Sequence, residues 1–413
     1  MHIVIVGGGG REHALAWKLR QSPRVSRISI TAHNFATAQF ANVAPAEAAA
    51  LADFCKRESV ALAVVGPEAP LADGIADSLR DAGIPTLGPS REAARIESSK
   101  IFAKQLMQKC GIRTADFVAA DSVAAAEKWC AARRPPYIVK ADGLAAGKGV
   151  LVCESAEEAR RGAAAMLDGK FGAASARILL EEFVRGREMS FMALADGETA
   201  IPLASSRDYK RLRAGGEGPN TGGMGAVSPA PGADDNLQNR IMDEIIYPAL
   251  RGMKEKGAPF CGFLYAGLMI DGDDIWTLEF NCRPGDPETQ AVLPRWRGDC
   301  LPSFLAAARG DLRGRRIEWD ARATAGVVFA AAGYPENPRG GDIITLPENE
   351  DDGAMIFHAG TKADADGNPI TSGGRVLSVV ALGENAADAK KRAYAAARKI
   401  RFAGMQFRDD IGD

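Results

Sequence analysis

This sequence has few histidines, no closely spaced cysteine pair and no long apolar segment. Only four histidines occur in 413 residues, and the seven cysteines are scattered, odd in number and without a CxxC pair. That distribution argues against a zinc cluster and suits a reducing compartment. The N-terminus lacks the apolar core of a signal peptide, and no later stretch reaches membrane-spanning length. We therefore expect a soluble, cytoplasmic protein without a membrane partner.

The chain also lacks an excess of charge of either sign. Its 51 lysines and arginines are interspersed with 53 aspartates and glutamates, which gives a formal net charge of −2. No broad basic face indicates a nucleic acid, and no acidic tail indicates disorder, so a small-molecule partner is favoured. A length of 413 residues is enough for about two to four domains with sizeable cores.

The dinucleotide-binding fingerprint is incomplete. Residues 2–31 predict a strand, a four-glycine turn, a helix and a second strand, which together open a Rossmann-like unit. A fingerprint that begins at Gly7 needs its third glycine at position 12, which is Glu12, and no acid follows the second strand to hold a ribose. NAD is therefore disfavoured. The turn can still bind one phosphate at the helix N-terminus beside Arg11, although a purely structural turn is equally compatible with the sequence.

The most informative stretch is a glycine-rich loop between two predicted strands. A strand that ends at Lys140 leads into loop 143–149, which carries Lys148, and a second strand covers residues 150–153. Glycines let the backbone approach an anion closely and lysines neutralise its charge, so the stretch indicates a polyphosphate site. The spacing excludes a P-loop, because three residues separate the first two glycines and a glycine follows Lys148. From this motif alone, an ordinary turn with a solvated lysine remains open.

Two other parts of the sequence carry acidic or amide side chains near the ends of predicted strands, where α/β sheets bind their ligands. Glu68 follows the buried strand 62–65 at its carboxyl end, so it is a ligand candidate, with a surface loop acid as the alternative. Glu279 and Asn281 lie two apart on a predicted strand and so share one face. Their oxygens suit magnesium better than zinc, although a salt-bridged strand end is the alternative. Residues 207–229 show no period and predict a long functional loop.

The remaining pattern predicts α/β and α+β domains. One long helical stretch is expected at 89–111, and a smaller α+β unit at 114–195 with a strand that pairs through an Asp-Gly turn. A helix at 234–256 precedes two strands. The last domain is expected to contain short strands and one terminal helix, at residues 327–331, 342–346, 354–358, 376–380 and 386–400.

Seven ordered motifs spread over nearly the whole chain, at residues 9–14, 65–70, 140–149, 218–225, 281–290, 358–362 and 373–377. Together they resemble the phosphoribosylamine-glycine ligases (glycinamide ribonucleotide synthetases) of the ATP-grasp superfamily. The resemblance implies a Rossmann-like N-terminal domain, two ATP-grasp central domains and a small α+β C-terminal domain. Their expected bounds are 1–100 for the first, 101–120 with 193–325 for the large central domain, 121–192 for the small lid domain and 326–413 for the last.

The resemblance also implies a reaction. Glycine would be joined to 5-phosphoribosylamine through glycyl phosphate, giving glycinamide ribonucleotide, ADP and phosphate in de novo purine biosynthesis. The expected co-substrate is ATP with Mg²⁺ or Mn²⁺, and the expected state is a monomer that binds small molecules and no nucleic acid. Because such a reaction needs no protein nucleophile, catalysis would rest on positioning and electrostatics.

The site residues follow from the resemblance. Those expected at the nucleotide are Lys100, Lys140, Gly147, Lys148, Glu181, Glu182, Phe183, Val184 and Glu188. Those expected at the metal are Glu279 and Asn281. Those expected at the substrates are Gly9, Gly10, Arg11, Glu12, Asn34, Gly66, Pro67, Glu68, Asn220, Gly222, Gly223, Arg283 and Asp286. Those expected to be catalytic are Arg283, Asp208 and Lys140.

Two departures from the family pattern concern the substrate side. Residues 32–37 replace a Pro-Gly-Asn-Ala-Gly loop and keep only Asn34 and one alanine, and Pro284 replaces an aromatic residue. Two alternatives share the phosphate and metal parts: another purine-pathway ATP-grasp ligase, and a nucleotide-binding relative that has lost activity through the altered loop. The presence of Lys100, Lys140 and the Glu279–Asn281 pair weighs against the second alternative.

Overall fold

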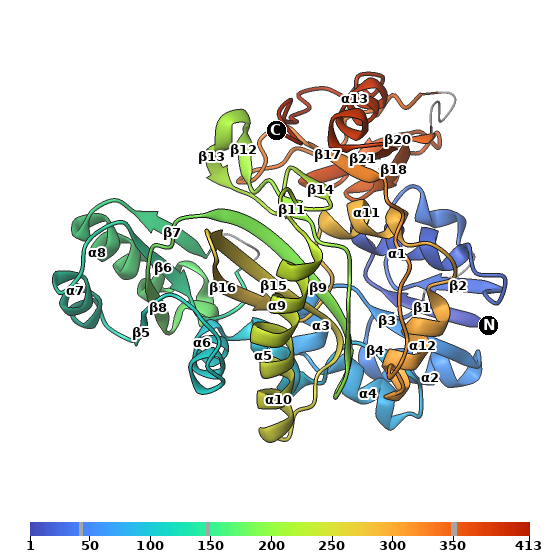
Figure 1. The fold of residues 1–413 in the computed structure, drawn as a ribbon. Coiled ribbons are helices and arrows are strands. Elements are labelled where there is room, and N and C mark those ends of the chain that lie inside the picture. Colours follow the sequence, from blue (N-terminus) through green and yellow to red (C-terminus); the bar gives the residue numbers. More distant parts are fainter. Residues whose placement is uncertain (41–43, 146–148, 348–352) are drawn as a thin grey trace.

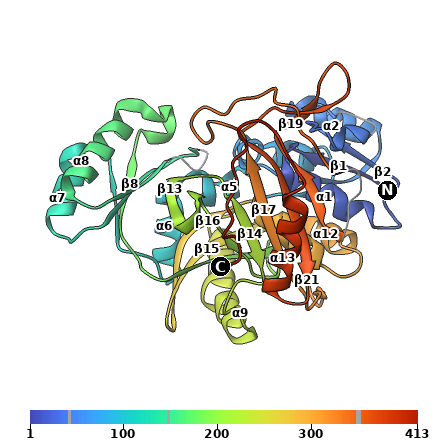
Figure 2. The same ribbon diagram turned by 90° about the horizontal axis from the view of Figure 1, so that it is seen from above.

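A computed structural model describes residues 1–40, 44–145, 149–347 and 353–413. The chain forms four parts (Figure 1). A large central domain contains an antiparallel sheet, and around it lie an N-terminal domain, a small domain that projects to one side and a C-terminal domain. Seen from above, the small domain and the N-terminal domain lie on opposite sides of that centre (Figure 2). In the described residues, no helix is long and apolar enough to span a membrane.

The N-terminal domain confirms the predicted Rossmann-like start. Its four parallel strands have the order β2-β1-β3-β4: β1 (His2–Val6), β2 (Arg27–Ile30), β3 (Val60–Val65) and β4 (Thr86–Leu87). Strand β1 is buried along its whole length, because α1 (Gly10–Arg20) covers one face and α2 (Ala48–Arg57) with α4 (Ile75–Asp81) covers the other. A parallel sheet covered on both faces needs the continuous apolar runs that the sequence shows.

The helical stretch predicted at 89–111 is two helices instead of one. Helix α5 (Arg91–Ser98) ends before Ser99, whose backbone is extended, and α6 (Lys100–Lys109) starts immediately after it. The Ser99 hydroxyl caps the backbone N–H of Phe102 and donates to a carboxylate oxygen of Asp142, which also accepts from the N–H of Ile101. Capping of this kind starts a new helix and turns the chain, so Lys100 lies at a helix N-terminus.

The small domain is an antiparallel sheet backed by two helices. Its strands have the order β5-β8-β6-β7: β5 (Phe117–Ala120), β6 (Tyr137–Ala141), β7 (Val150–Cys153) and β8 (Ile178–Glu182), with α7 (Val123–Ala131) and α8 (Ala156–Ala165) on one face. Strand β5 lies before the predicted boundary at 121. Strand β9 (Arg187–Asp196) pairs wholly outside this sheet, so the predicted boundary at 192 falls inside it. We therefore propose that the small domain runs from β5 to β8.

The large central domain carries the sheet on which the cavity described below is built. Its order is β10-β9-β15-β16, with β10 (Ala200–Pro202), β15 (Cys261–Asp271) and β16 (Asp274–Asn281). The predicted pairing of β9 with β10 is confirmed. The helix predicted at 234–256 is α9 (Asp235–Ile241) and α10 (Tyr247–Glu255), joined by a π-helical turn, η5 (Met242–Ile246). Helix α3 (Glu68–Ala72) begins within the 65–70 motif, helix α11 (Glu288–Val292) begins within the 281–290 motif, and helix α12 (Leu301–Arg309) comes after α11 in the chain.

The prediction of an aperiodic loop at 207–229 is wrong. This stretch contains β11 (Arg207–Asp208), the hairpin of β12 (Arg211–Arg213) and β13 (Glu217–Asn220), and β14 (Gly225–Ser228). Strands β11 and β14 join the C-terminal sheet, whose order is β11-β14-β17-β21-β18. Strand β11 pairs with β14, and β14 also pairs with the distant strand β17, so the local sequence pattern did not reveal this sheet.

The C-terminal domain packs one helix on that sheet. Its strands are β17 (Ala323–Ala330), β18 (Met355–His358) and β21 (Arg375–Gly383), and α13 (Ala386–Ala397) covers one face, with a hairpin of β19 (Thr361–Ala363) and β20 (Pro369–Thr371). The predicted boundary at 326 falls inside β17. The strand predicted at 342–346 is absent, since within this range only isolated bridges occur, at Ile343 and Thr345.

The atypical loop 32–37 is part of the contact between the N- and C-terminal domains. The Asn34 amide donates to the carbonyls of Gly8 (3.0 Å) and His358 (2.8 Å). Phe35, in place of a small residue, packs on the His358 ring with centroids 5.6 Å apart. The backbone N–H of His358 donates to His13 Nδ1 (2.9 Å). The altered residues therefore fill a domain junction.

We expect stability to fall as the pH drops from 6.5 to 4. Burial lowers the pKa of both His13 and His358 from 6.5 to about 4. The unfolded chain then binds more protons in this window, so protonation favours unfolding, by on the order of 3 kcal/mol for each histidine. Urea unfolding of the wild type and of His13→Asn across this range measures the effect. The variant should lose less stability on acidification; parallel curves would contradict the prediction.

Candidate active site

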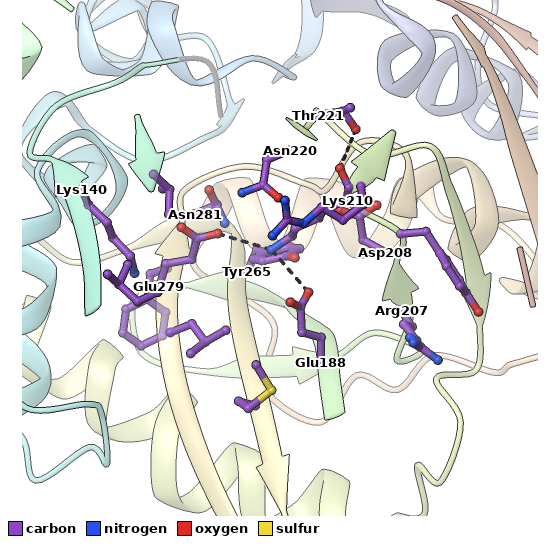
Figure 3. Close-up of a pocket in the computed structure, with 18 of the residues that line it drawn as sticks. Lys140, Glu188, Arg207, Asp208, Lys210, Asn220, Thr221, Tyr265, Glu279 and Asn281 are labelled. Atoms are coloured by element: carbon purple, nitrogen blue, oxygen red, sulfur yellow. Dashed lines mark hydrogen bonds and ion pairs between the residues drawn. The ribbon is translucent and has the colours of Figure 1, made fainter. Parts of the chain in front are cut away.

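A cavity of about 1050 Å³ lies where the four parts meet. Residues from all of them line it, including Glu68, Lys140, Glu279 and Arg375. Figure 3 shows side chains from β6, β9, β16 and the 207–221 segment pointing toward one space. The cavity has one side next to the small domain and a second side next to the N- and C-terminal domains.

On the side next to the small domain, two lysines that the sequence analysis predicted at the nucleotide lie near each other. Lys100 begins α6 and its ammonium donates to the carbonyl of Gly143 (3.4 Å), while Lys140 is the last residue but one of β6. Burial lowers the pKa of Lys100, and the Glu279 carboxylate opposes that shift. Gly147 and Lys148 lie outside the described residues. The two lysines supply positive charge at one end of the glycine loop, as a polyphosphate site requires.

Residues 181–184, which the sequence analysis predicted at the nucleotide, line the same side of the cavity. The side chain of Glu181 is buried, and its Oε2 accepts from the Lys140 ammonium (2.9 Å). Lys104, which the sequence analysis did not single out, lies 3.3 Å from Glu181 Oε1. The sequence could have indicated Lys104, because it lies one turn after Lys100 and residues four apart share a helix face. Glu188 is half exposed and faces Lys210 at 3.9 Å.

The predicted metal ligands lie on one face of β16. Glu279 lies 3.9 Å from the Lys210 ammonium, and the Asn281 side-chain oxygen accepts from Arg283 (3.4 Å). Burial opposes ionisation of Glu279, but the ammonium groups of Lys210, Lys140 and Lys100 lower its pKa. A carboxylate and an amide oxygen beside a phosphate-binding surface fit a hard divalent cation. In the described residues, no group of three or more histidine, cysteine, aspartate or glutamate side chains is placed to hold a metal ion by itself.

Arg283 is the central cation on the second side of the cavity. Its guanidinium contacts Glu68 (3.3 Å) and Glu97 (3.1 Å), and Glu97 also accepts from the backbone N–H of Cys282 (2.8 Å). Burial opposes the charged form, but Glu97 and Glu68 raise the pKa of Arg283. Glu68, predicted to hold ribose, therefore helps to orient Arg283.

The N-terminal turn is held together by Glu12. Its carboxylate accepts from the N–H of Gly9 (2.7 Å) and pairs with Arg11 (2.5 Å), and it lies so close to Gly66 that a side chain there would clash. Arg11 also donates to the carbonyl of Pro284 (3.1 Å). Among the predicted substrate residues, Arg11, Glu68, Asn220, Gly222, Arg283 and Asp286 line the cavity. The lining does not include Gly9, Gly10, Glu12, Asn34, Gly66, Pro67 or Gly223.

Two acidic residues, Asp208 and Glu288, also line the cavity. Asp208 is partly buried, and burial of its carboxyl together with the Glu288 carboxylate raises its pKa well above the usual range. Ser190 joins Glu288 (2.9 Å) to the Tyr265 hydroxyl (2.8 Å). The sequence analysis did not select Glu288, although its place in the 281–290 motif could have indicated it.

Arg375 is a second cation that the sequence analysis left without a role. It pairs with Asp286 (2.9 Å) and donates to the carbonyls of Asp286 and Gly222. Burial opposes ionisation of Asp286, but Arg375 and Arg11 lower its pKa. Its motif at 373–377 was visible in the sequence, but its position beside Asp286 depends on the fold.

Comparisons with known proteins show which family the chain resembles. The chain matches the phosphoribosylglycinamide synthetase family in three parts: the N domain at residues 1–97, the ATP-grasp (A) domain at 98–289 and the C domain at 324–413. It is 47% identical to phosphoribosylamine--glycine ligase of Neisseria meningitidis serogroup B, over all of this chain and 99% of that one. Identity to the Ralstonia nicotianae protein of the same name is 48%, with the same coverage.

Solved structures show the same likeness. The crystal structure of phosphoribosylamine--glycine ligase from Thermotoga maritima superposes with a TM-score of 0.87 at 33% identity, covering all of both chains. Biotin carboxylase from Campylobacter jejuni superposes with a TM-score of 0.75 at 15% identity, covering all of this chain and 94% of that one, which shows a shared fold alone.

Proposed function

The chain belongs to the phosphoribosylglycinamide synthetase family, and on this basis we propose that its cavity ligates glycine to 5-phosphoribosylamine with ATP as co-substrate. The observation that carries the proposal is the convergence of Lys100, Lys140, Glu279, Asn281 and Arg283 on one cavity. The products are glycinamide ribonucleotide, ADP and phosphate, a step of purine biosynthesis. We propose a monomer that acts on small molecules in the cytoplasm.

Two displacements make up the reaction. A glycine carboxylate oxygen attacks the γ-phosphorus of ATP in line, which forms glycyl phosphate and releases ADP. The amine of phosphoribosylamine then attacks the glycyl carbonyl carbon: the C–N bond forms, the C–O bond to phosphate breaks and the amine loses a proton. Neither step needs a covalent bond to the protein, so this chain contributes by positioning and by electrostatics.

We assign the nucleotide contacts as follows. Lys100 and Lys140 neutralise the phosphates, while residues 181–184 receive the adenine between the two central domains. Glu279 and Asn281 would hold magnesium, or manganese, which when bound spreads the charge that develops on the phosphates during transfer. The lowered pKa of Glu279 supports this role, because an ionised carboxylate is the better ligand.

We assign the two substrates to the other side of the cavity. Arg283, oriented by Glu68 and Glu97, is placed to hold the glycine carboxylate. The repulsion between Asp208 and Glu288 is relieved if a cation binds beside them, and the glycine ammonium is such a cation. Arg11 and Arg375 supply charge for the 5-phosphate of phosphoribosylamine.

One assay tests the function directly. ADP release, coupled to NADH oxidation, should require glycine, magnesium and freshly generated phosphoribosylamine together. Omission of any one should reduce the rate to background. Turnover with another acid and no response to glycine would favour a different purine-pathway ligase. ATP binding without ADP release for any amine and acid would indicate an inactive relative.

A further inference from the structure

Residues 408–413 of the C-terminal domain pack against the hairpin of β12 and β13 (Figure 1). Both sides of this contact reach the cavity: Arg408 and Asp410 line it from the C-terminal domain, and Gly215 and Gly216 line it from the hairpin turn. The proposed reaction assigns no role to any of these four residues. The contact therefore calls for an explanation of its own.

Arg408 is the centre of that contact. Its side chain is 4% exposed, and its guanidinium donates to both carboxylate oxygens of Asp410 (2.7 and 2.6 Å). The guanidinium also donates to the backbone carbonyl of Arg211 on β12 (3.1 Å). Asp410 Oδ2 in turn accepts from the backbone N–H of Gly215 in the hairpin turn (2.8 Å). These charge-assisted hydrogen bonds tie both β12 and the turn to the C-terminal domain.

The C-terminal side of the contact is fixed by α13. The Tyr394 hydroxyl donates to the carbonyl of Arg408 (2.7 Å) and accepts from the backbone N–H of Ile411 (3.0 Å). Ile411 is fully buried in the core of the C-terminal domain, and Tyr209 belongs to the same core. The Arg408 guanidinium lies over the Tyr209 ring, 5.2 Å from its centroid. Because a packed core resists displacement, the hairpin is the part whose position depends on Arg408.

Lys210 connects the hairpin to the proposed reaction. It immediately precedes Arg211, whose carbonyl accepts from Arg408. The Lys210 ammonium lies 3.9 Å from a carboxylate oxygen of Glu188 and 3.9 Å from one of Glu279. Burial opposes the charged form, but Glu188 raises the pKa of Lys210 well above its usual range. A shift of the hairpin would therefore move a charged ammonium relative to the proposed metal ligand Glu279.

We propose that Arg408 is a positioning residue of the C-terminal domain, which holds the β12–β13 hairpin at the cavity and so keeps Lys210 in place beside Glu279. The inference rests on the proposed phosphoryl transfer at Glu279. An ammonium stabilises the charge that develops during such a transfer only if its distance from the reacting phosphate is fixed. Through Arg408, the C-terminal domain acts on a step that the central domains carry out.

Arg408→Met tests the proposal, because methionine keeps much of the volume and removes every hydrogen bond of the guanidinium. We expect kcat for ADP release to fall about tenfold, since Lys210 is no longer held in place. The affinity for ATP, titrated without glycine, should change by less than about threefold. Arg408→Lys keeps a charge for Asp410 but lacks the fork that also reaches Arg211, so its kcat should return to within about threefold of the wild type.

Limited trypsin digestion measures the hairpin directly. Arg213 ends β12 and is exposed next to the turn. Cleavage after Arg213 requires local opening of the hairpin, so its rate should rise about fivefold or more in folded Arg408→Met. Arg392→Met, which breaks a partly exposed pair with Asp388 on α13, is the matched control. It should match the wild type in both cleavage rate and kcat.

A purely structural role predicts a lower thermal stability of Arg408→Met with an unchanged kcat for the folded enzyme. If that variant does not fold cooperatively, Asp410→Asn keeps the shape of the side chain, weakens the pair and should raise the cleavage rate about threefold. Equal cleavage rates in the variants and the wild type, or an unchanged kcat in a folded variant, would overturn the inference. A wild type without glycine-dependent ADP release would instead refute the proposed function, whatever the cleavage rates, because digestion needs no substrate.

Discussion

Glu279→Gln should lower kcat by about a thousandfold while changing the affinity for ATP by only a few-fold. Glutamine has nearly the same shape, so β16 and the base-binding side are left intact. The amide removes a negative charge that faces Lys210 and that the surrounding lysines keep ionised. It therefore weakens cation binding and leaves an excess of positive charge where phosphoryl transfer is proposed to occur. Ground-state binding of adenine, at residues 181–184, does not depend on that charge.

Steady-state ADP release gives kcat, and nucleotide titration gives the affinity. The magnesium concentration for half-maximal rate should also rise in the variant. Asp274→Asn is the matched control, because Asp274 lies on the same strand but at an exposed ion pair with Arg113. It should behave as the wild type. A Glu279→Gln enzyme with a normal rate and a normal magnesium requirement would show that the cation site is elsewhere.

Arg283→Met should lower kcat/KM for glycine about a hundredfold or more and leave the KM for ATP within about threefold. The guanidinium is held between Glu68 and Glu97, so its positive charge has a fixed position beside the proposed site of the glycine carboxylate. Methionine fills the space but cannot bind the acid. The substitution also leaves Glu97 buried without its partner, which should cost on the order of 3 kcal/mol of stability.

Arg283→Lys separates these two effects, since it keeps a charge for Glu97 and loses the fork geometry. It should recover most of the stability but little of the glycine specificity. Rates with varied glycine and varied ATP, together with thermal unfolding, measure both quantities. Arg240→Met, which breaks the exposed pair with Glu244, is the control and should leave both KM values unchanged. Equal losses for glycine and ATP would remove Arg283 from the acid site.

Local sequence patterns predicted those helices and strands whose structure depends on their own residues. The apolar runs of β1 and β3 indicate a covered parallel sheet, and the two-residue spacing of Glu279 and Asn281 places both on one strand face. The break at Ser99 was missed because it depends on Asp142, which belongs to another domain. The strands in 207–229 were missed because their partners include β17, a distant part of the chain.

The sequence by itself determined the class of the domains and the family resemblance, and it predicted the phosphate-binding motif and the metal-ligand pair, because each of these patterns consists of short runs of neighbouring residues. Only the tertiary structure decided which side chains meet. It placed Lys104 against Glu181, Glu68 against Arg283 and Arg375 against Asp286. Such contacts join residues far apart in the chain, and they form only when the packed domains hold both partners in place.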